Sequence, residues 1–178
     1  VILGTFRSTF IFPGSTVPSI VFYNLHNCAC RSLIEADNSS YLCSNRKDST
    51  YIYMKNIAET YWKRKKMPIP HLLLSDYEGR NVWSHKGIVH WRGMNICMVT
   101  DGYWRNKSAT NLLDIDYMYL CKGYKGEIAP LQKLFHIKRI VLDASLGDYK
   151  SKAYKEECKT LGLDYIDISE KGSFRILL

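Results

Sequence analysis

The sequence predicts a single layered α/β domain with mixed sheets. In its C-terminal half, short apolar runs of strand length alternate with segments of helical spacing, which is typical of layered α/β proteins. In its N-terminal half, short β-rich runs are separated by turn residues, which favours antiparallel strands. The chain has 178 residues, of which 46% are hydrophobic and 24% are charged. This length and balance suffice to bury one core.

The domain is expected to follow a short leader. Pro13, Gly14 and Pro18 interrupt the first residues, so residues 1–18 are predicted to be a linker from a membrane-proximal region and residues 19–178 the domain. Three short strands then form a meander. They are residues 20–25, 29–36 and 40–43.

A helix is predicted after this meander. Ser49 or Thr50 can cap it, and apolar residues at helical spacing continue it to about Lys66. The basic run that starts at Lys63 lies in its last turn, where positive charge complements the helix dipole. Pro68 lies just beyond and ends the helix.

The middle of the chain is predicted to hold three strands. They are residues 71–74, 87–91 and 94–100. The last two form a hairpin that turns at residues 92–93. Residues 76–79 are predicted to be a turn, and the polar and aromatic stretch 101–111 a loop.

The remainder of the chain alternates between strands and helices. The predicted strands are residues 115–120, 138–142, 163–168 and 174–177, and the predicted helices are residues 127–135 and 150–161. This alternation is the main support for the layered α/β class.

The composition indicates anionic partners. The formal net charge is +8, which favours nucleic acid, lipid head groups or phosphorylated ligands, although a merely basic soluble protein remains the alternative. Thirteen tyrosines and four tryptophans fill mostly core positions, with some available for a stacking surface. No apolar run in the sequence is long enough to span a bilayer.

The cysteine and histidine patterns argue against a metal module. Of six cysteines only Cys28 and Cys30 are close, and no C-x-x-C occurs. The five histidines form no H-x-H or H-x-x-x-H pair, and the odd spacing of His85 and His90 predicts opposite faces of one strand. No G-x-S-x-G nucleophile motif is present. The sequence therefore predicts no cofactor.

Four aspartates lie at predicted strand ends. Asp114 and Asp116 share one side of a strand entrance, where they either hold a cation or are simply solvated. Asp101 and Asp143 each follow a strand, and α/β sheets collect ligands at such ends. We favour a helix-capping role for Asp143.

A turn with two glycines and two lysines separates one strand from the next predicted helix. Its residues are 120–126, and Lys122, Gly123 and Lys125 lie within it. Free backbone N–H groups, a helix N-terminus and two lysines suit a phosphate, although Walker spacing is absent. The alternative is a tight turn with solvated lysines.

Several segments of the C-terminal half resemble a known family. They are residues 118–126, 140–145, 156–158, 161–163 and 170–174. Together they resemble the soluble C-terminal region of ComEC family competence proteins of the Bacteroidetes type, which span the membrane many times and take up single-stranded DNA. The resemblance covers residues 19–178 and is most specific over residues 94–178.

The resemblance implies partners and a location. It implies contact with single-stranded DNA and with the transmembrane channel part of the same polypeptide, with other competence proteins as further candidates. It also implies an inner-membrane protein whose domain faces away from the cytoplasm.

The resemblance further implies a degenerate metallo-β-lactamase fold, an αββα sandwich. In other ComEC branches this region has that fold and is a suspected metal-dependent nuclease. Asp101 aligns with the family's bridging aspartate, but the H-x-H-x-D-H motif has no counterpart, and Lys122 and Gly123 replace its His-His-Gly. The resemblance thus implies a lost metal site, with Asp101, Asp114 and Asp116 as remnants.

The leading hypothesis is a non-enzymatic accessory domain that contacts single-stranded DNA. The predicted phosphate contacts are Lys63, Arg64, Lys65, Lys66, Arg105, Lys107, Lys122, Gly123 and Lys125, and the predicted base-stacking residues are Tyr103, Trp104 and Tyr124. The alternatives are a divergent nuclease that uses Asp101, Asp114 and Asp116, and a structural domain that packs on its own membrane segments.

Overall fold

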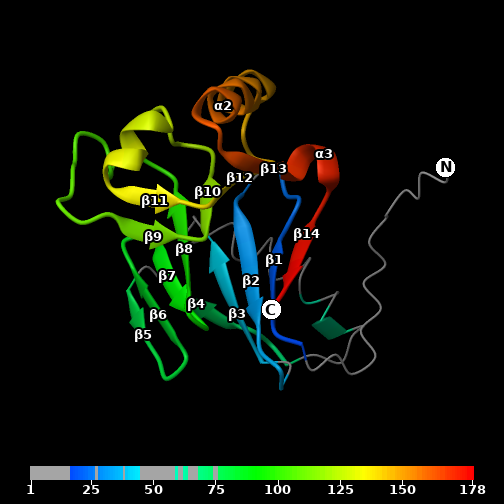
Figure 1. The fold of residues 1–178 in the computed structure, drawn as a ribbon. Helices are drawn as coiled ribbons and strands as arrows, with labels where there is room; N and C mark the ends of the chain where they lie inside the picture. The colour runs from blue at the N-terminus through cyan, green and yellow to red at the C-terminus, as the bar shows by residue number, and fades with distance from the viewer. Residues whose placement is uncertain are drawn as a thin grey trace.

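Two mixed β-sheets pack face to face in the computed structural model (Figure 1). The structure describes residues 17–26, 28–37, 39–44, 59, 62–63, 68–73 and 76–178. Most of the predicted leader lies outside the described residues. So does most of the helix predicted to end near Lys66, of which Glu59, Trp62 and Lys63 are described and are helical.

The first sheet has five strands in the order β14-β1-β2-β3-β4. Its strands are β1 (Ser19–Phe22), β2 (Cys30–Ile34), β3 (Ser40–Ser44), β4 (His71–Leu73) and β14 (Phe174–Leu177). The predicted meander of β1, β2 and β3 is antiparallel, and β4 pairs parallel to β3. The last strand returns to pair with the first, with Ile20 opposite Ile176.

The second sheet has seven strands in the order β13-β12-β10-β8-β7-β6-β5. Its strands are β5 (Tyr77–Glu78), β6 (Val82–His85), β7 (Ile88–Trp91), β8 (Met94–Val99), β10 (Tyr117–Leu120), β12 (Arg139–Leu142) and β13 (Asp164–Asp167). The strands β8, β10, β12 and β13 run parallel, whereas β5 to β8 are antiparallel.

Two predictions in the middle of the chain were wrong. Residues 76–79, predicted as a turn, contain β5, and β6 was not predicted at all. His85 and His90 were expected on opposite faces, but a hairpin turn places them on neighbouring strands. His90 is opposite Trp83, two residues before His85, so both histidines point to the same face.

Residues 113–137 also depart from the prediction. The strand predicted over 115–120 is divided at Asp116 into β9 (Leu113–Ile115) and β10, and β9 pairs with β11 (Phe135–Ile137) in a separate parallel ribbon. The helix predicted over 127–135 is only a short 3₁₀ helix, η1 (Ala129–Lys133), with a proline in its first turn. Two backbone hydrogen bonds hold this irregular segment: the Ala109 N–H donates to the Lys133 carbonyl, and the Leu113 N–H donates to the Leu134 carbonyl.

Two α-helices complete the described C-terminal half. The predicted helix over 150–161 is present as α2 (Asp148–Leu161), and a single turn, α3 (Ile168–Lys171), follows β13. Within the ranges that the structure describes, no helix combines the length and apolar character needed to cross a membrane.

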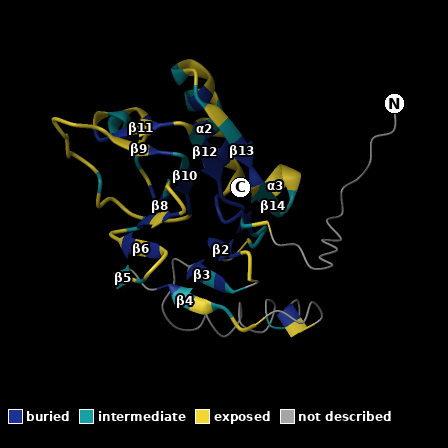
Figure 2. Ribbon diagram, turned by 60° about the horizontal axis from the view of Figure 1, so that its bottom comes forward, coloured by how far each residue is buried: buried dark blue, intermediate teal, exposed yellow. Residues whose placement is uncertain are grey.

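The main core lies between the two sheets. Phe22 and Leu33 from one sheet pack with Trp91, Tyr119 and Val141 from the other. A second core covers the outer face of the seven-stranded sheet and includes Tyr154 and Cys158 of α2. Figure 2 shows this burial along the strands.

A third, smaller core lies on the outer face of the five-stranded sheet. Trp62 packs there against Cys28, Cys30 and Leu42. Apolar side chains therefore lie both between the sheets and on their outer faces, which is the arrangement of a layered mixed α/β domain.

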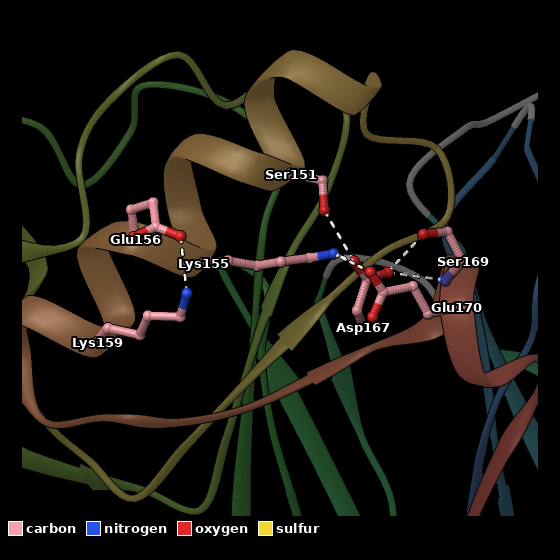
Figure 3. A network of polar contacts seen from close by, with 7 residues as sticks. All are labelled: Ser151, Lys155, Glu156, Lys159, Asp167, Ser169 and Glu170. Atoms are coloured by element: carbon pink, nitrogen blue, oxygen red, sulfur yellow. Dashed lines mark hydrogen bonds and ion pairs between the residues drawn. The ribbon is translucent and has the colours of Figure 1, made fainter.

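Polar contacts join Ser151 and Lys155 of α2 to Asp167 at the end of β13 (Figure 3). Lys155 Nζ lies 2.5 Å from Asp167 Oδ2, and Ser151 Oγ donates to the same oxygen at 2.9 Å. Ser169 donates from its backbone N–H at 2.9 Å and from its hydroxyl at 2.6 Å to Asp167 Oδ1. The exposed carboxylate of Glu170 also accepts from Lys155.

All six cysteines lie in described segments, where all are buried thiols. Burial raises the pKa of the Cys97 and Cys158 thiols to about 12. Burial also raises the pKa of the thiols of Cys30, Cys43 and Cys121. Because the thiolate is the reactive form, these thiols should be inert in the folded chain.

We therefore predict that the native chain resists thiol alkylation at pH 8. In denaturant all six cysteines should react rapidly with iodoacetamide, whereas the folded chain should react at a rate limited by unfolding. Mass spectrometry of the alkylated chain measures both. Fast labelling of several cysteines without denaturant would contradict the buried placement.

Candidate nucleic-acid interface

The parallel strands of the seven-stranded sheet end at one edge. Because β8, β10 and β12 run in the same direction, the loops that follow them, residues 100–112, 121–128 and 143–147, lie at the same end of the sheet. We call this end the carboxyl edge. Such edges collect ligands in α/β proteins.

The loops after β8 and β10 touch each other. Gly123 has φ of +108°, and a Cβ atom there would lie 2.2 Å from the carbonyl oxygen of Thr100. Only glycine permits both this conformation and this approach. Burial, and then the nearby Glu157, raise the pKa of Tyr124 to about 12, and the positive charge of Arg105 opposes this shift.

An exposed aromatic group is held among lysines at this edge. Lys107 Nζ lies 3.3 Å from the ring centroid of Tyr103, and Lys86 Nζ lies 5.6 Å from it. The Tyr103 ring is 42% exposed and meets Trp104 edge-on at 4.7 Å, and Trp104 in turn contacts Phe135 at 5.0 Å. We call Tyr103, Trp104, Lys86 and Lys107 the aromatic–lysine cluster.

The structure brings some of the predicted phosphate contacts together. Arg105, Lys107, Lys122 and Lys125 are exposed on the two touching loops. Lys63 is also exposed and pairs with Glu59 at 3.4 Å, but its neighbour Trp62 packs on the outer face of the other sheet. Lys63 therefore lies on a different layer. The predicted contacts Arg64, Lys65 and Lys66 lie outside the described residues.

Tyr124 does not have the exposed ring that was predicted. It is only 5% exposed, stacks on Tyr154 at 6.2 Å and donates its hydroxyl to the Glu127 carbonyl at 2.6 Å. Its ring fills the second core below the loop, so the assignment as a stacking residue is corrected to a structural one.

Sequence reasoning missed three residues of this edge. Tyr149, in the first turn of α2, is 87% exposed, and Lys150 beside it donates to the Gly126 carbonyl at 3.1 Å. The buried stripe of α2 is Ser151, Tyr154 and Cys158, and Tyr149 lies off this spacing, which is a signal available in the sequence. No pattern in the sequence points to Lys86, because it approaches Tyr103 only when the β6–β7 hairpin has folded.

The predicted backbone cradle for a phosphate is already occupied. The N–H groups of Ile128 and Ala129 at the start of η1 donate to Glu157 Oε1 at 2.6 and 2.9 Å. The Lys122 N–H donates to Ser145 Oγ at 3.2 Å. The lysine side chains, rather than the backbone, are therefore what this loop offers to an anion.

The three remnant aspartates do not converge. Asp101 lies at the carboxyl edge and accepts from the Tyr103 N–H at 2.8 Å, whereas Asp116 accepts from the Asn95 N–H at the opposite end of β8. The strand between them places these two carboxylates roughly 20 Å apart. Asp114 pairs with His136 at 3.1 Å near Asp116. In the described part of the chain, no three His, Cys, Asp or Glu side chains gather as metal ligands.

Asp143 is buried between the sheets. It accepts from the Tyr119 hydroxyl through one oxygen and from the Ser145 N–H at 2.9 Å through the other. Burial raises its pKa despite these bonds. The predicted helix cap is wrong, because the N-cap of α2 is Gly147. Asp143 instead stabilises the turn that leads to the helix.

The comparisons with known proteins identify the family. No curated protein and no solved structure matches the chain. A family model described as the ComEC C-terminal domain matches residues 20–178, which is nearly the entire chain and agrees with the resemblance seen in the sequence. The chain therefore belongs to the ComEC C-terminal domain family.

Proposed function

We propose that this chain is a non-enzymatic domain of a ComEC-type DNA-uptake protein and that it contacts single-stranded DNA at its carboxyl edge. Membership in the ComEC C-terminal domain family indicates involvement in DNA uptake. The observation that carries the DNA contact is the exposed Tyr103 ring with Lys107 and Lys86 against it.

This cluster has the two chemical elements that single strands require. An exposed aromatic ring stacks on an unpaired base, and adjacent ammonium groups meet its phosphates. An incoming base replaces one lysine on the Tyr103 ring, and that lysine then pairs with the neighbouring phosphate. Arg105, Lys122 and Lys125 continue the positive charge over the adjoining loops.

The placement of the carboxylates favours a binding role over hydrolysis. A two-metal nuclease needs ligands that converge on ions about 4 Å apart. Asp101 and Asp116 lie at opposite ends of β8, and each accepts a backbone hydrogen bond. The divergent-nuclease alternative requires these same side chains to act together.

The layered arrangement supports a metallo-β-lactamase-like fold for the domain. Two mixed sheets share one core, and helical residues pack on both outer faces, as an αββα sandwich requires. In this proposal the domain adjoins the membrane-spanning channel of the same polypeptide and faces away from the cytoplasm. Other competence proteins are additional partners in this setting.

The test is fluorescence anisotropy of a labelled oligo(dT) titrated with the chain at low and at physiological salt. We expect the double variant Arg105→Glu, Lys107→Glu to weaken binding by about 10–100-fold. It should also flatten the dependence of log K on log salt by about 1.4, because each phosphate contact contributes about 0.7 for single strands.

The matched control is the double variant Lys138→Glu, Lys159→Glu, which makes the same change of net charge. Lys138 pairs with Asp116, and Lys159 lies in the last turn of α2, so both residues are remote from the carboxyl edge. The control should retain binding within about threefold. Equal losses of affinity in both variants would contradict the site assignment. If the chain binds no oligo(dT) even at low salt, a domain that only packs on its membrane segments is favoured instead.

A further inference from the structure

We infer that the nucleic-acid path continues from the aromatic–lysine cluster onto the open part of the seven-stranded sheet, where Trp83 stacks on a second base. This inference rests on the proposed function and extends it to a residue that neither the sequence nor the family points to. Its occupant is the same single strand that meets Tyr103.

The outer face of the seven-stranded sheet is covered over only part of its width. The second core places α2, η1, β9 and β11 over β8, β10 and β12. On the flanking β6 and β7, Trp83, His85 and His90 point to this same face and are exposed, whereas Ile88, opposite His85, is buried in the second core. An open sheet surface therefore adjoins the covered part.

Trp83 is the largest exposed side chain on this open surface. It is 42% exposed, whereas its strand neighbours Val82 and Ser84 point into the core and are buried. A single exposed tryptophan needs no explanation by itself. Its significance comes from what lies beside it.

A continuous row of rings and cations joins Trp83 to the cluster. The ring of Trp83 lies 6.0 Å from that of His85, and Lys86 follows in the hairpin turn. The ammonium group of Lys86 reaches within 5.6 Å of the Tyr103 ring. Lys86 thus stands between two exposed aromatic platforms, where it can pair with the phosphate that links the bases stacked on each.

Charge limits the path beyond Trp83. Asp76 Oδ1 lies 2.7 Å from His85 Nδ1, and Glu78 is directly opposite Trp83 on the edge strand β5. These carboxylates repel phosphates on the β5 side of Trp83 and His85. A strand that stacks on Trp83 must therefore keep its backbone toward Lys86 and the carboxyl edge.

The experiment measures how affinity depends on oligonucleotide length. Labelled oligo(dT) probes from about 4 to 16 nucleotides, the usual site sizes of single-strand binding folds, are titrated with wild type, Trp83→Ala and Trp83→Phe. We expect Trp83→Ala to lose on the order of tenfold in affinity for the long probes and little for the shortest. Trp83→Phe keeps an aromatic face and should retain most of the affinity.

Two further measurements separate the possible failures. The exposed Ile69 lies just before β4 of the five-stranded sheet, and Ile69→Ala is the control for loss of exposed apolar surface. Thermal melts confirm that each variant folds. If Trp83→Ala matches wild type at every length while Arg105→Glu, Lys107→Glu still weakens binding, the extension is overturned and the proposed function stands. If wild type binds no probe, both are overturned.

Discussion

Replacement of Asp167 with alanine is expected to lower the free energy of unfolding by about 1–3 kcal/mol, because it removes the acceptor of several buried or partly buried hydrogen-bond donors. Asp167 is 2% exposed and accepts from Lys155, Ser151 and both donors of Ser169 (Figure 3). Alanine leaves the ammonium group of Lys155 with only the exposed carboxylate of Glu170.

Chemical denaturation followed by circular dichroism measures this loss. The matched control is Asp164→Ala on the same strand, which removes an exposed pair with Arg139 at 3.3 Å. That pair is worth about 0–1 kcal/mol. If the two variants lose equal stability, the buried network contributes no more than a surface pair does.

The pH dependence of this effect has a defined sign. Burial raises the pKa of Asp167, but the hydrogen bonds from Lys155, Ser169 and Ser151 outweigh burial and leave the pKa below its ordinary value of 3.8. A carboxyl whose pKa is lower in the folded than in the unfolded chain stabilises the fold at pH values above the unfolded pKa. This stabilisation is lost as the pH falls through the folded pKa. The difference between wild type and Asp167→Ala should therefore be full at neutral pH and shrink below about pH 4.

Substitution of Gly123 by valine is expected to destabilise the chain by roughly 2–5 kcal/mol. A left-handed conformation costs an ordinary residue about 1–2 kcal/mol, and forced overpacking costs about 1–3 kcal/mol more. At Gly123 both terms apply, because φ is +108° and the new Cβ would meet the backbone carbonyl of Thr100 at 2.2 Å. Neither group can move away without displacing one of the two loops.

Gly102→Val in the neighbouring loop is the control. A Cβ atom at Gly102 has nothing within 4 Å, and its φ does not lie in the left-handed region. Its stability should change by less than about 0.5 kcal/mol. Thermal and chemical unfolding of both variants measure the contrast. A well-folded Gly123→Val of wild-type stability would contradict the close approach of the two loops.

The sequence by itself determined the α/β class, the first three antiparallel strands, helix α2 and the family. These features depend on patterns within short segments: the β-rich runs of the N-terminal half, the helical spacing of residues 150–161, and the motifs of residues 94–178. Hydrophobic spacing and turn residues are local properties of the sequence, so they can be recognised without knowing the tertiary contacts.

Only the tertiary structure decided which side chains of the candidate site are exposed and which of them meet. Tyr124 is buried because it fills space under α2, and Tyr149 is exposed because it lies off the buried stripe of that helix. Lys86 and Tyr103 meet because a hairpin and a strand end place them side by side. Such contacts arise from pairing between residues distant in the chain. A local pattern shows which face a residue takes within its own strand, but it does not show what lies opposite that face.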